Sequence, residues 1–223
     1  MDLLKERAET GRIYIMNIDH CNTHSPFKDK VYMSNLCQEI TLPTKPIQHI
    51  DDTEGEIALC ILSAVNLGLI RDKEDLEELC DLSVRALDEI IDYQEYPVEA
   101  ARISTESRRS LGVGYIGLAH FLAKNHVKYD DKEALMLVDE VTEAFQYYLL
   151  KSSNTLAQEK GKCDWFDRTK YSDGILPIDT YKKDLDKIVK RKLSYDWKQL
   201  RKDIQEHGLR HSTLSAQMPS ESS

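Results

Sequence analysis

Two long stretches of the chain carry apolar residues at the spacing of an amphipathic helix. The first follows Asp72, where apolar or small residues recur every three or four positions: Leu76, Leu79, Ser83, Leu87 and Ile90. Acidic residues and an arginine lie between them, as in a helix with one face against a core. Asp72 can cap the first turn, and Asp75 occupies the capping-box position. The pattern therefore predicts a helix that begins directly after Asp72.

The second stretch begins near Asp130 or Asp131 and ends at Gly161, a residue type that commonly terminates helices. Its predicted buried stripe consists of Leu137, Val141, Phe145, Tyr148 and Ser152. At a rise of 1.5 Å per residue, such a helix is about 45 Å long. A helix of that length indicates a larger body to pack against than a small free-standing domain provides.

The first third of the chain predicts shorter, more extended elements. Residues 12–18 are β-branched and aromatic and predict a strand, whereas the polar residues 19–26 predict a loop. Pro43 and Pro46 end any regular element that precedes them. Residues 56–70 are mostly apolar, and their length fits either a buried strand or a buried helix.

The last part of the chain is lysine-rich and then extended. Residues 179–202 predict a helix with a solvated face, with a docking surface as the alternative. Residues 210–216 predict a strand that runs into the Ser-rich residues 218–223. Together these patterns predict the α/β class with a helix-rich second half.

The composition is that of a folded, water-soluble protein. The chain has 223 residues, 41% hydrophobic and 31% charged, enough for one domain or one large segment of a bigger one. No apolar run approaches the roughly 20 residues that span a bilayer, and residues 1–10 lack the apolar core of a secretory signal. The net charge of −9 argues against binding to a phosphate backbone. We therefore expect neither a membrane nor a nucleic acid as partner.

The cysteines indicate a reducing compartment. There are five of them, at irregular spacing: Cys21, Cys37, Cys60, Cys80 and Cys163. An odd, irregular set is a poor disulfide framework, and without a signal peptide the cytoplasm is the expected location. If a phage encodes the chain, that location is the cytoplasm of its bacterial host.

Residues 112–117, Gly-Val-Gly-Tyr-Ile-Gly, match the G-x-G-x-x-G pattern of dinucleotide-binding proteins. A single match is weak, and residues 107–111 before it do not make a convincing strand. The acidic residue expected about twenty positions later is also missing, because Asp130 and Asp131 are predicted helix starts. We therefore interpret the glycines as a place where a short strand meets a helix and backbones pack closely.

A zinc site is the weaker interpretation of the residues around His20. Cys21 and His24 form one pair at metal-ligand spacing, with Cys37 and His49 further along the chain. Structural zinc usually takes ligands from two such pairs, and only one is present. Hydrogen bonds within a loop are the simpler role for residues 20–24, and we predict no metal.

The most informative segment is residues 34–40, Ser-Asn-Leu-Cys-Gln-Glu-Ile. In an extended chain Asn35, Cys37 and Glu39 would point to one side, because side chains alternate along a strand. An amide that can hold a sugar hydroxyl, a thiol and a proton-accepting carboxylate would then lie within a few ångströms of each other. From the residues alone, a buried cysteine with exposed neighbours remains an open alternative.

This segment resembles the N-x-C-x-E finger loop of the class I ribonucleoside-diphosphate reductase large (alpha, catalytic) subunit. The resemblance continues over nearly the whole chain, through residues 12–27, 41–46, 55–60, 66–68, 92–94, 174–181 and 208–223. It is closest to the aerobic enzymes of enteric bacteria and their phages, and it identifies the chain as a central fragment of such a subunit.

The resemblance implies a role for each residue of the loop. In the family the loop cysteine is transiently oxidised to a thiyl radical, which removes the 3′ hydrogen of the bound ribonucleotide. Cys37 matches this cysteine, Glu39 the carboxylate that takes the 3′-hydroxyl proton, and Asn35 the amide that holds the sugar hydroxyls. Leu36 and Gln38 complete the loop that contacts the substrate.

The resemblance also assigns residues outside the loop. Cys60 matches one of two cysteines that close to a disulfide as the 2′-hydroxyl leaves as water, and its partner lies outside this chain. Residues 218–223 resemble the loop that holds the substrate diphosphate, with these substrate-binding residues: Pro219, Ser220, Glu221, Ser222 and Ser223. The family commonly has threonine where Ser222 stands, which keeps the hydroxyl group.

The implied fold is part of the ten-stranded α/β barrel of these enzymes, with residues 1–223 as one segment. The finger loop at about 33–41 would reach into the barrel, and the phosphate loop would occupy residues 218–223. The allosteric N-terminal domain and the C-terminal tail are expected to lie outside the chain, so we expect it to be inactive alone.

The implied cofactors and partners lie outside the chain as well. The segment itself is expected to bind no cofactor, because a metal-containing small subunit supplies the radical. Thioredoxin or glutaredoxin supplies the electrons. The expected partners are therefore the remaining portions of the large subunit, the small subunit, the ribonucleoside diphosphate substrate and these reductants.

Two alternatives remain at this point. One is a non-catalytic remnant or interaction fragment of a split reductase gene. The other is a cysteine hydrolase, which needs a histidine beside Cys37; His20, His24 and His49 are the candidates. In a hydrolase, Asn35 and Glu39 would have no role.

Overall fold

The computed structural model describes residues 2–219. At its centre two parallel strands pair, β1 (Ile61–Asn66) and β2 (Leu111–Ile116), with Ile61 opposite Leu111 and Asn66 opposite Ile116. The connection between the strands contains α3 (Lys73–Tyr93) and α4 (Glu99–Arg108). A helical crossover is what parallel neighbours require. Within the segment 56–70, left open by the sequence, residues 61–66 thus form a strand, and the 3₁₀ turn Leu67–Leu69 follows it.

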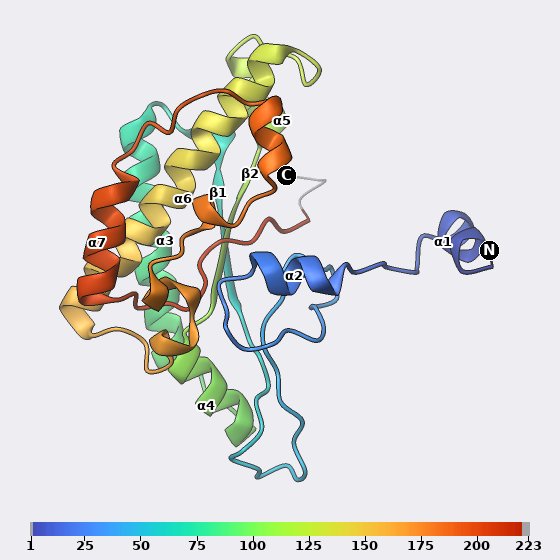
Figure 1. Cartoon of the computed structure of the whole chain (residues 1–223), viewed down its shortest axis with the longest axis vertical. Helices are drawn as coiled ribbons and strands as arrows, with labels where there is room; N and C mark the ends of the chain where they lie inside the picture. The colour runs from blue at the N-terminus through green and yellow to red at the C-terminus, as the bar shows by residue number, and fades with distance from the viewer. Residues whose placement is uncertain (1, 220–223) are drawn as a thin grey trace.

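Helices cover one side of the strands (Figure 1). They are α3, α6 (Lys132–Lys160) and α7 (Trp197–His207), and the short helix α5 (Leu118–Lys124) follows β2. Further 3₁₀ turns occur at Phe166–Arg168, Lys170–Asp173, Pro177–Asp179 and Lys183–Lys187. The mixed α/β class and the helix-rich second half are confirmed.

The start of α3 is as predicted, but its buried face is not. The Asp72 carboxylate accepts the Asp75 backbone N–H at 2.9 Å, which confirms the cap. The side chains that enter the core are Leu76, Cys80, Val84, Leu87 and Ile91. Leu79 and Ile90 remain 36% and 42% exposed, so the predicted stripe was wrong at both.

The long helix α6 agrees with its sequence pattern. It ends at Gly161, whose φ of +90° favours glycine. Val141, Phe145 and Ser152 of the predicted stripe are buried, and Leu137 and Tyr148 are half-buried against the same core. Glu143, which the sequence did not single out, accepts hydrogen bonds from Trp197 Nε1 at 3.0 Å and from Ser194 N at 2.8 Å.

The N-terminal elements differ from the prediction. Residues 12–18 form no strand, and residues 19–24, predicted as part of a loop, belong to helix α2 (Ile18–His24). The β-branched run has no ladder partner among the described residues, and a strand needs one. Helix α1 (Asp2–Thr10) buries none of its residues and stands away from the body (Figure 1).

The lysine-rich segment is also different from the prediction. Residues 180–196 contain only the 3₁₀ turn Lys183–Lys187, and α7 begins after the Asp196 cap. The predicted strand at 210–216 is confirmed only in part. It runs beside β2 with backbone hydrogen bonds such as Val113 N to Leu214 O at 2.8 Å, but Val113 and Ser215 form its single bridge among the described residues.

Within residues 2–219, no helix is both long and apolar enough to cross a membrane.

Candidate active site

The segment that carries Cys37 is a closed turn and not an extended strand. The Asn35 backbone N–H donates to Ile40 O at 3.0 Å, and Asn35 Oδ1 accepts the Ile40 N–H at 3.1 Å. Gln38 adopts a φ of +64°, which tightens the turn. The predicted alternation of three side chains along one strand is therefore wrong, because these hydrogen bonds fold the backbone back on itself.

The turn exposes its tip and buries one end. Leu36 is 85% exposed and Cys37 is also exposed, whereas Glu39 is half-buried. One Glu39 oxygen, Oε2, is inaccessible to solvent and has no hydrogen-bond partner among the described residues. Glu39 lines a cavity of about 260 Å³ together with Cys21, Thr41, Thr213 and Ser215. A buried, unpaired carboxylate oxygen at a cavity is available to accept a proton, or a hydrogen bond from a hydroxyl group.

Cys60 lies in the same region, close to Glu39. Burial, and secondarily the negative charge of Glu39, raise the pKa of the Cys60 thiol to about 12. At neutral pH the thiol therefore stays protonated. A nucleophilic cysteine needs the opposite shift, so Cys60 suits a role as a hydrogen donor and not as an attacking thiolate.

The glycines of residues 112–117 lie inside β2 and at the start of α5, not in a phosphate-binding loop between them. Gly112 and Gly114 are strand residues, and Gly117 has a φ of +71° as the residue before α5. A Cβ atom at Gly114 would lie 2.4 Å from Ala216 O. The predicted role in close backbone packing is confirmed.

The residues around His20 form hydrogen bonds, as predicted, but they lie in helix α2 and not in a loop. Asn22 donates to Val31 O at 2.9 Å and accepts the Val31 N–H at 2.8 Å, which ties α2 to the segment before the turn. The His24 ring bonds to Thr180 O, and His24 also lines the cavity that Glu39 lines. Within residues 2–219 no histidine hydrogen-bonds to Cys37, so the geometry that a cysteine hydrolase needs is not present there.

A buried charge cluster fixes this whole region to the helices. The Arg108 guanidinium, 1% exposed, donates to Glu56 at 2.7 Å and to Asp29 at 2.9 Å. Arg168 binds the same two carboxylates at 2.8 and 2.7 Å. Although partial burial opposes it, these hydrogen bonds hold the pKa of Asp29 below its usual value. The segments on both sides of the turn are thereby anchored.

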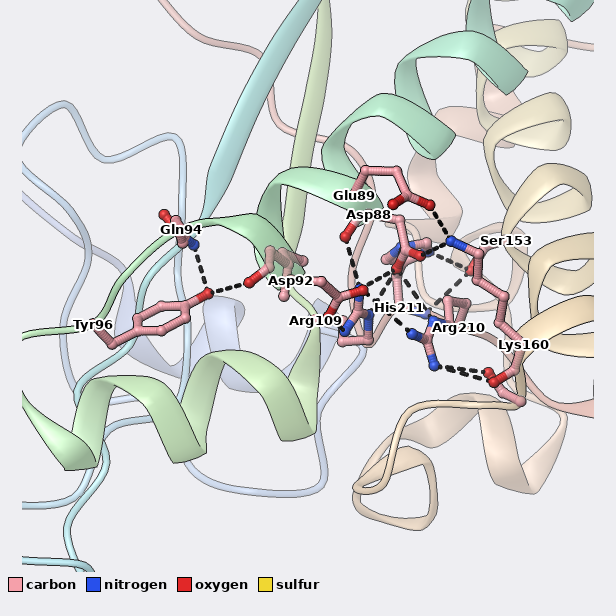
Figure 2. A network of polar contacts seen from close by, with 12 residues as sticks. Asp88, Glu89, Asp92, Gln94, Tyr96, Arg109, Ser153, Lys160, Arg210 and His211 are labelled. Carbon is pink, nitrogen blue, oxygen red and sulfur yellow. Dashed lines mark hydrogen bonds and ion pairs between the residues drawn. The ribbon is translucent and has the colours of Figure 1, made fainter.

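A second buried cluster fixes the segment after α7 (Figure 2). His211 is fully buried; its Nε2 lies 3.1 Å from Asp88 Oδ1 and its Nδ1 lies 2.9 Å from Ser153 Oγ. Arg109 and Arg210 also donate to Asp88, at 2.7 and 3.2 Å. The sequence analysis missed this cluster, because its members are far apart along the chain and form no motif.

The Asp88 cluster predicts a pH-dependent stability. Burial first, with the positive Arg109 and Arg210 nearby, lowers the pKa of His211 from 6.5 to about 4, although Asp88 opposes the shift. The folded chain therefore binds fewer protons than the unfolded chain between these values. The contribution of His211 to the free energy of unfolding is therefore complete above pH 6.5. It is lost as the pH is lowered towards 4, by about 3 kcal/mol in total.

Urea unfolding of the wild-type chain and of His211→Asn, at several pH values from 7.5 to 4, checks this expectation. The variant should lose stability overall but show a flatter dependence on pH across that window. Identical slopes for the two proteins would contradict it.

The predicted phosphate loop lies mostly outside the described residues. Met218 is half-buried and Pro219 is exposed, whereas Ser220, Glu221, Ser222 and Ser223 fall beyond them. Their assignment to the substrate diphosphate stays a prediction.

The chain is similar to known proteins over nearly its whole length. The chain matches the family "Ribonucleotide reductase, barrel domain" over residues 1–223. It is 62% identical to the ribonucleoside-diphosphate reductase subunit alpha of Haemophilus influenzae and 58% identical to the ribonucleoside-diphosphate reductase 1 subunit alpha of Escherichia coli. The corresponding subunit of phage T4 is 44% identical. The chain therefore belongs to the ribonucleotide reductase barrel-domain family.

These matches cover nearly all of this chain but only part of each relative. Each alignment includes 99% of this chain but only 29% or 30% of the relative. The chain thus spans about three-tenths of the length of the curated relatives that it matches.

Proposed function

We propose that the chain forms the reducing site of a ribonucleoside-diphosphate reductase, as part of the ten-stranded barrel of the alpha subunit. In this proposal the turn at residues 35–40 is the tip of the finger loop. The observation that carries the proposal is that Glu39 has a buried, unpaired oxygen at a cavity and lies near enough for its charge to help raise the pKa of the Cys60 thiol, which stays protonated. The membership in the family gives this arrangement its chemical meaning.

The residues of the turn act on the ribose. Cys37, oxidised to a thiyl radical, takes the hydrogen atom from C3′ and becomes a thiol. Glu39 accepts the proton of the 3′-hydroxyl group. Asn35 uses its amide nitrogen on the sugar hydroxyls, since its oxygen already closes the turn. Leu36 and Gln38 form the remaining surface of the tip. Holding these groups on one short backbone lowers the entropic cost of their meeting one ribose.

Cys60 takes part in the reduction itself. The 2′-hydroxyl group leaves as water, and C2′ receives a hydrogen in its place. This change consumes two electrons and two protons, which two thiols supply as they close to a disulfide. Cys60 is one of the two, and the other lies outside this chain. Cys37 then returns its hydrogen to C3′ and is a thiyl radical again.

The proposed reaction also requires other polypeptides and other parts of the alpha subunit. The rest of the alpha subunit completes the barrel, and a metal-containing small subunit supplies the radical. Thioredoxin or glutaredoxin reduces the disulfide after each turnover. Residues 219–223 hold the substrate diphosphate.

Replacing Glu39 by glutamine tests the proposed arrangement. In the assembled reductase we expect nucleotide reduction to fall about a hundredfold, because the proton acceptor is lost. At the same time the pKa of Cys60 should fall below its value of about 12, because the neighbouring negative charge is gone. Turnover rates and the pH dependence of Cys60 alkylation measure the two effects.

Glu54→Gln is the matched control, because Glu54 pairs only loosely with Lys45, at 3.9 Å on the surface. It should leave turnover and Cys60 alkylation unchanged. Full activity of Glu39→Gln would overturn the proposed role of this carboxylate.

A further inference from the structure

The two glycines in the middle of β2 lie between the two halves of the proposed site. Gly112 faces the end of the segment that carries Cys60, and Gly114 faces the segment at 214–218 that leads to Pro219. Both glycines are buried within a strand, where glycine weakens the structure unless another group must approach closely. Neither glycine has a positive φ, so the backbone conformation does not require glycine at these positions. The absence of a side chain instead lets other groups approach the strand closely.

Gly114 sets how near the segment at 214–218 comes to β2. A Cβ atom here would lie 2.4 Å from the backbone oxygen of Ala216 and 2.8 Å from both Sδ and Cε of Met218. The Met218 side chain can move aside, but the Ala216 carbonyl belongs to a backbone held by the Ala216 N–H, which donates to Val113 O at 3.1 Å. A methyl group at position 114 therefore has to push this segment outward.

Gly112 stands beside the sulfur atom of Cys60. A Cβ atom here would lie 2.4 Å from Leu62 Cδ2, 3.1 Å from Cys60 Sγ and 3.2 Å from Ala216 Cβ. Leu62 is 45% exposed and can turn into solvent, so its contact is relieved cheaply. The contact with Cys60 Sγ remains, and a methyl group would crowd and cover that sulfur atom.

Gln217 supplies an independent anchor for the same segment. Its amide nitrogen donates to Tyr115 O at 2.6 Å, and its amide oxygen accepts the Tyr115 N–H at 3.4 Å. The Gln217 side chain is exposed and is not among the core residues. It thus pins the end of the segment to β2 without contributing to the core.

We propose that Gly112 and Gly114 are positioning residues of the reducing site, with Gly114 placing the segment that leads to the substrate's diphosphate and Gly112 keeping space beside the Cys60 sulfur. This inference rests on the proposed function. It gives the two glycines separable effects, because one acts on substrate binding and the other on the thiol.

The test compares Gly114→Ala, Gly112→Ala and Gly161→Ala in the assembled reductase. For Gly114→Ala we expect the KM for the ribonucleoside diphosphate to rise at least tenfold with a smaller change in kcat, because a misplaced contact segment weakens binding. For Gly112→Ala we expect an unchanged KM and alkylation of Cys60 by iodoacetamide that is several-fold slower. Gly161→Ala adds a Cβ to open space at a positive φ, so it costs stability alone.

Gln217→Ala keeps the proposal testable if Gly114→Ala does not fold. It removes only the two bonds to Tyr115, and it should raise the KM several-fold with kcat unchanged. The proposal is overturned if Gln217→Ala and the folded glycine variants match Gly161→Ala in KM and in Cys60 alkylation.

Failure of the proposed function would look different from failure of this inference. If the wild-type assembly does not reduce nucleotides, the proposed function fails, yet Cys60 alkylation still reports on Gly112. If the wild type is active and none of these variants alters KM or alkylation, the proposed function stands and the positioning role is wrong.

Discussion

Replacing Cys37 by serine should abolish nucleotide reduction in the assembled reductase while leaving the assembly intact. Serine and cysteine have nearly the same shape, so an exposed side chain at the tip of the turn can be exchanged without disturbing the packing. The O–H bond of serine, however, is too strong to lose and regain a hydrogen atom in each turnover. We therefore expect deoxynucleotide formation at background level, with an unchanged elution volume of the complex.

A matched control separates this effect from a general need for thiols. Cys80 of α3 is fully buried, with its sulfur 4.0 Å from Phe145 O of α6, and it is not among the residues that line the cavity at Glu39. Cys80→Ala should lose some stability and keep its turnover. Turnover near the wild-type rate in Cys37→Ser would contradict the proposed thiyl radical on Cys37.

Replacing Arg108 by alanine should destabilise the chain by about 3–5 kcal/mol. The change leaves Glu56, which is 8% exposed, with Arg168 as its one cationic partner instead of two, and breaking a buried ion pair is expensive. It also removes the guanidinium from the rings of Phe27 and Trp165, whose centroids lie 5.6 and 4.8 Å away. Urea unfolding of the wild type and the variant at neutral pH measures the difference.

Arg85→Ala is the comparison for a surface ion pair. Arg85 binds Asp81 and Glu159 at 2.8 and 2.7 Å, but all three side chains are more than one-third exposed. Such pairs contribute about 0–1 kcal/mol. If Arg108→Ala costs no more than Arg85→Ala, the Arg108 cluster does not anchor the region around the turn.

The sequence predicted the helices better than the strands, for a physical reason. Helix periodicity and caps are local, so Asp72 and Gly161 mark real ends. The buried face of α3 was harder to predict, because Leu79 and Leu82 form a second apolar set beside Cys80 and Val84. Which set is buried depends on α6, a partner that the local pattern does not contain.

Strand prediction failed where pairing was decisive. Residues 12–18 have the composition of a strand but no ladder partner in the part of the chain that the structure describes. Residues 210–216 pair beside β2 only in part, through Ser215 and backbone bonds. A pairing partner is a long-range property, and composition alone does not supply it.

The candidate site was found from the sequence, but not its geometry. The spacing of Asn35, Cys37 and Glu39 singled out the segment, while the hydrogen bonds of Asn35 show a turn and not a strand. The charge clusters around Asp88 and Arg108 join residues that are far apart in the sequence. No motif announces them, and only the folded chain brings them together.

The most direct test of the proposed function follows Cys60 through one turnover. The assembled reductase, fully reduced and then freed of reductant, is given ribonucleoside diphosphate and stopped after a single turnover. Peptide mapping under non-reducing conditions then locates every disulfide. The account predicts one disulfide per product formed, joining Cys60 to a cysteine outside this chain. Product formed while Cys60 remains a free thiol, or a disulfide between Cys60 and Cys21, Cys80 or Cys163, would contradict it.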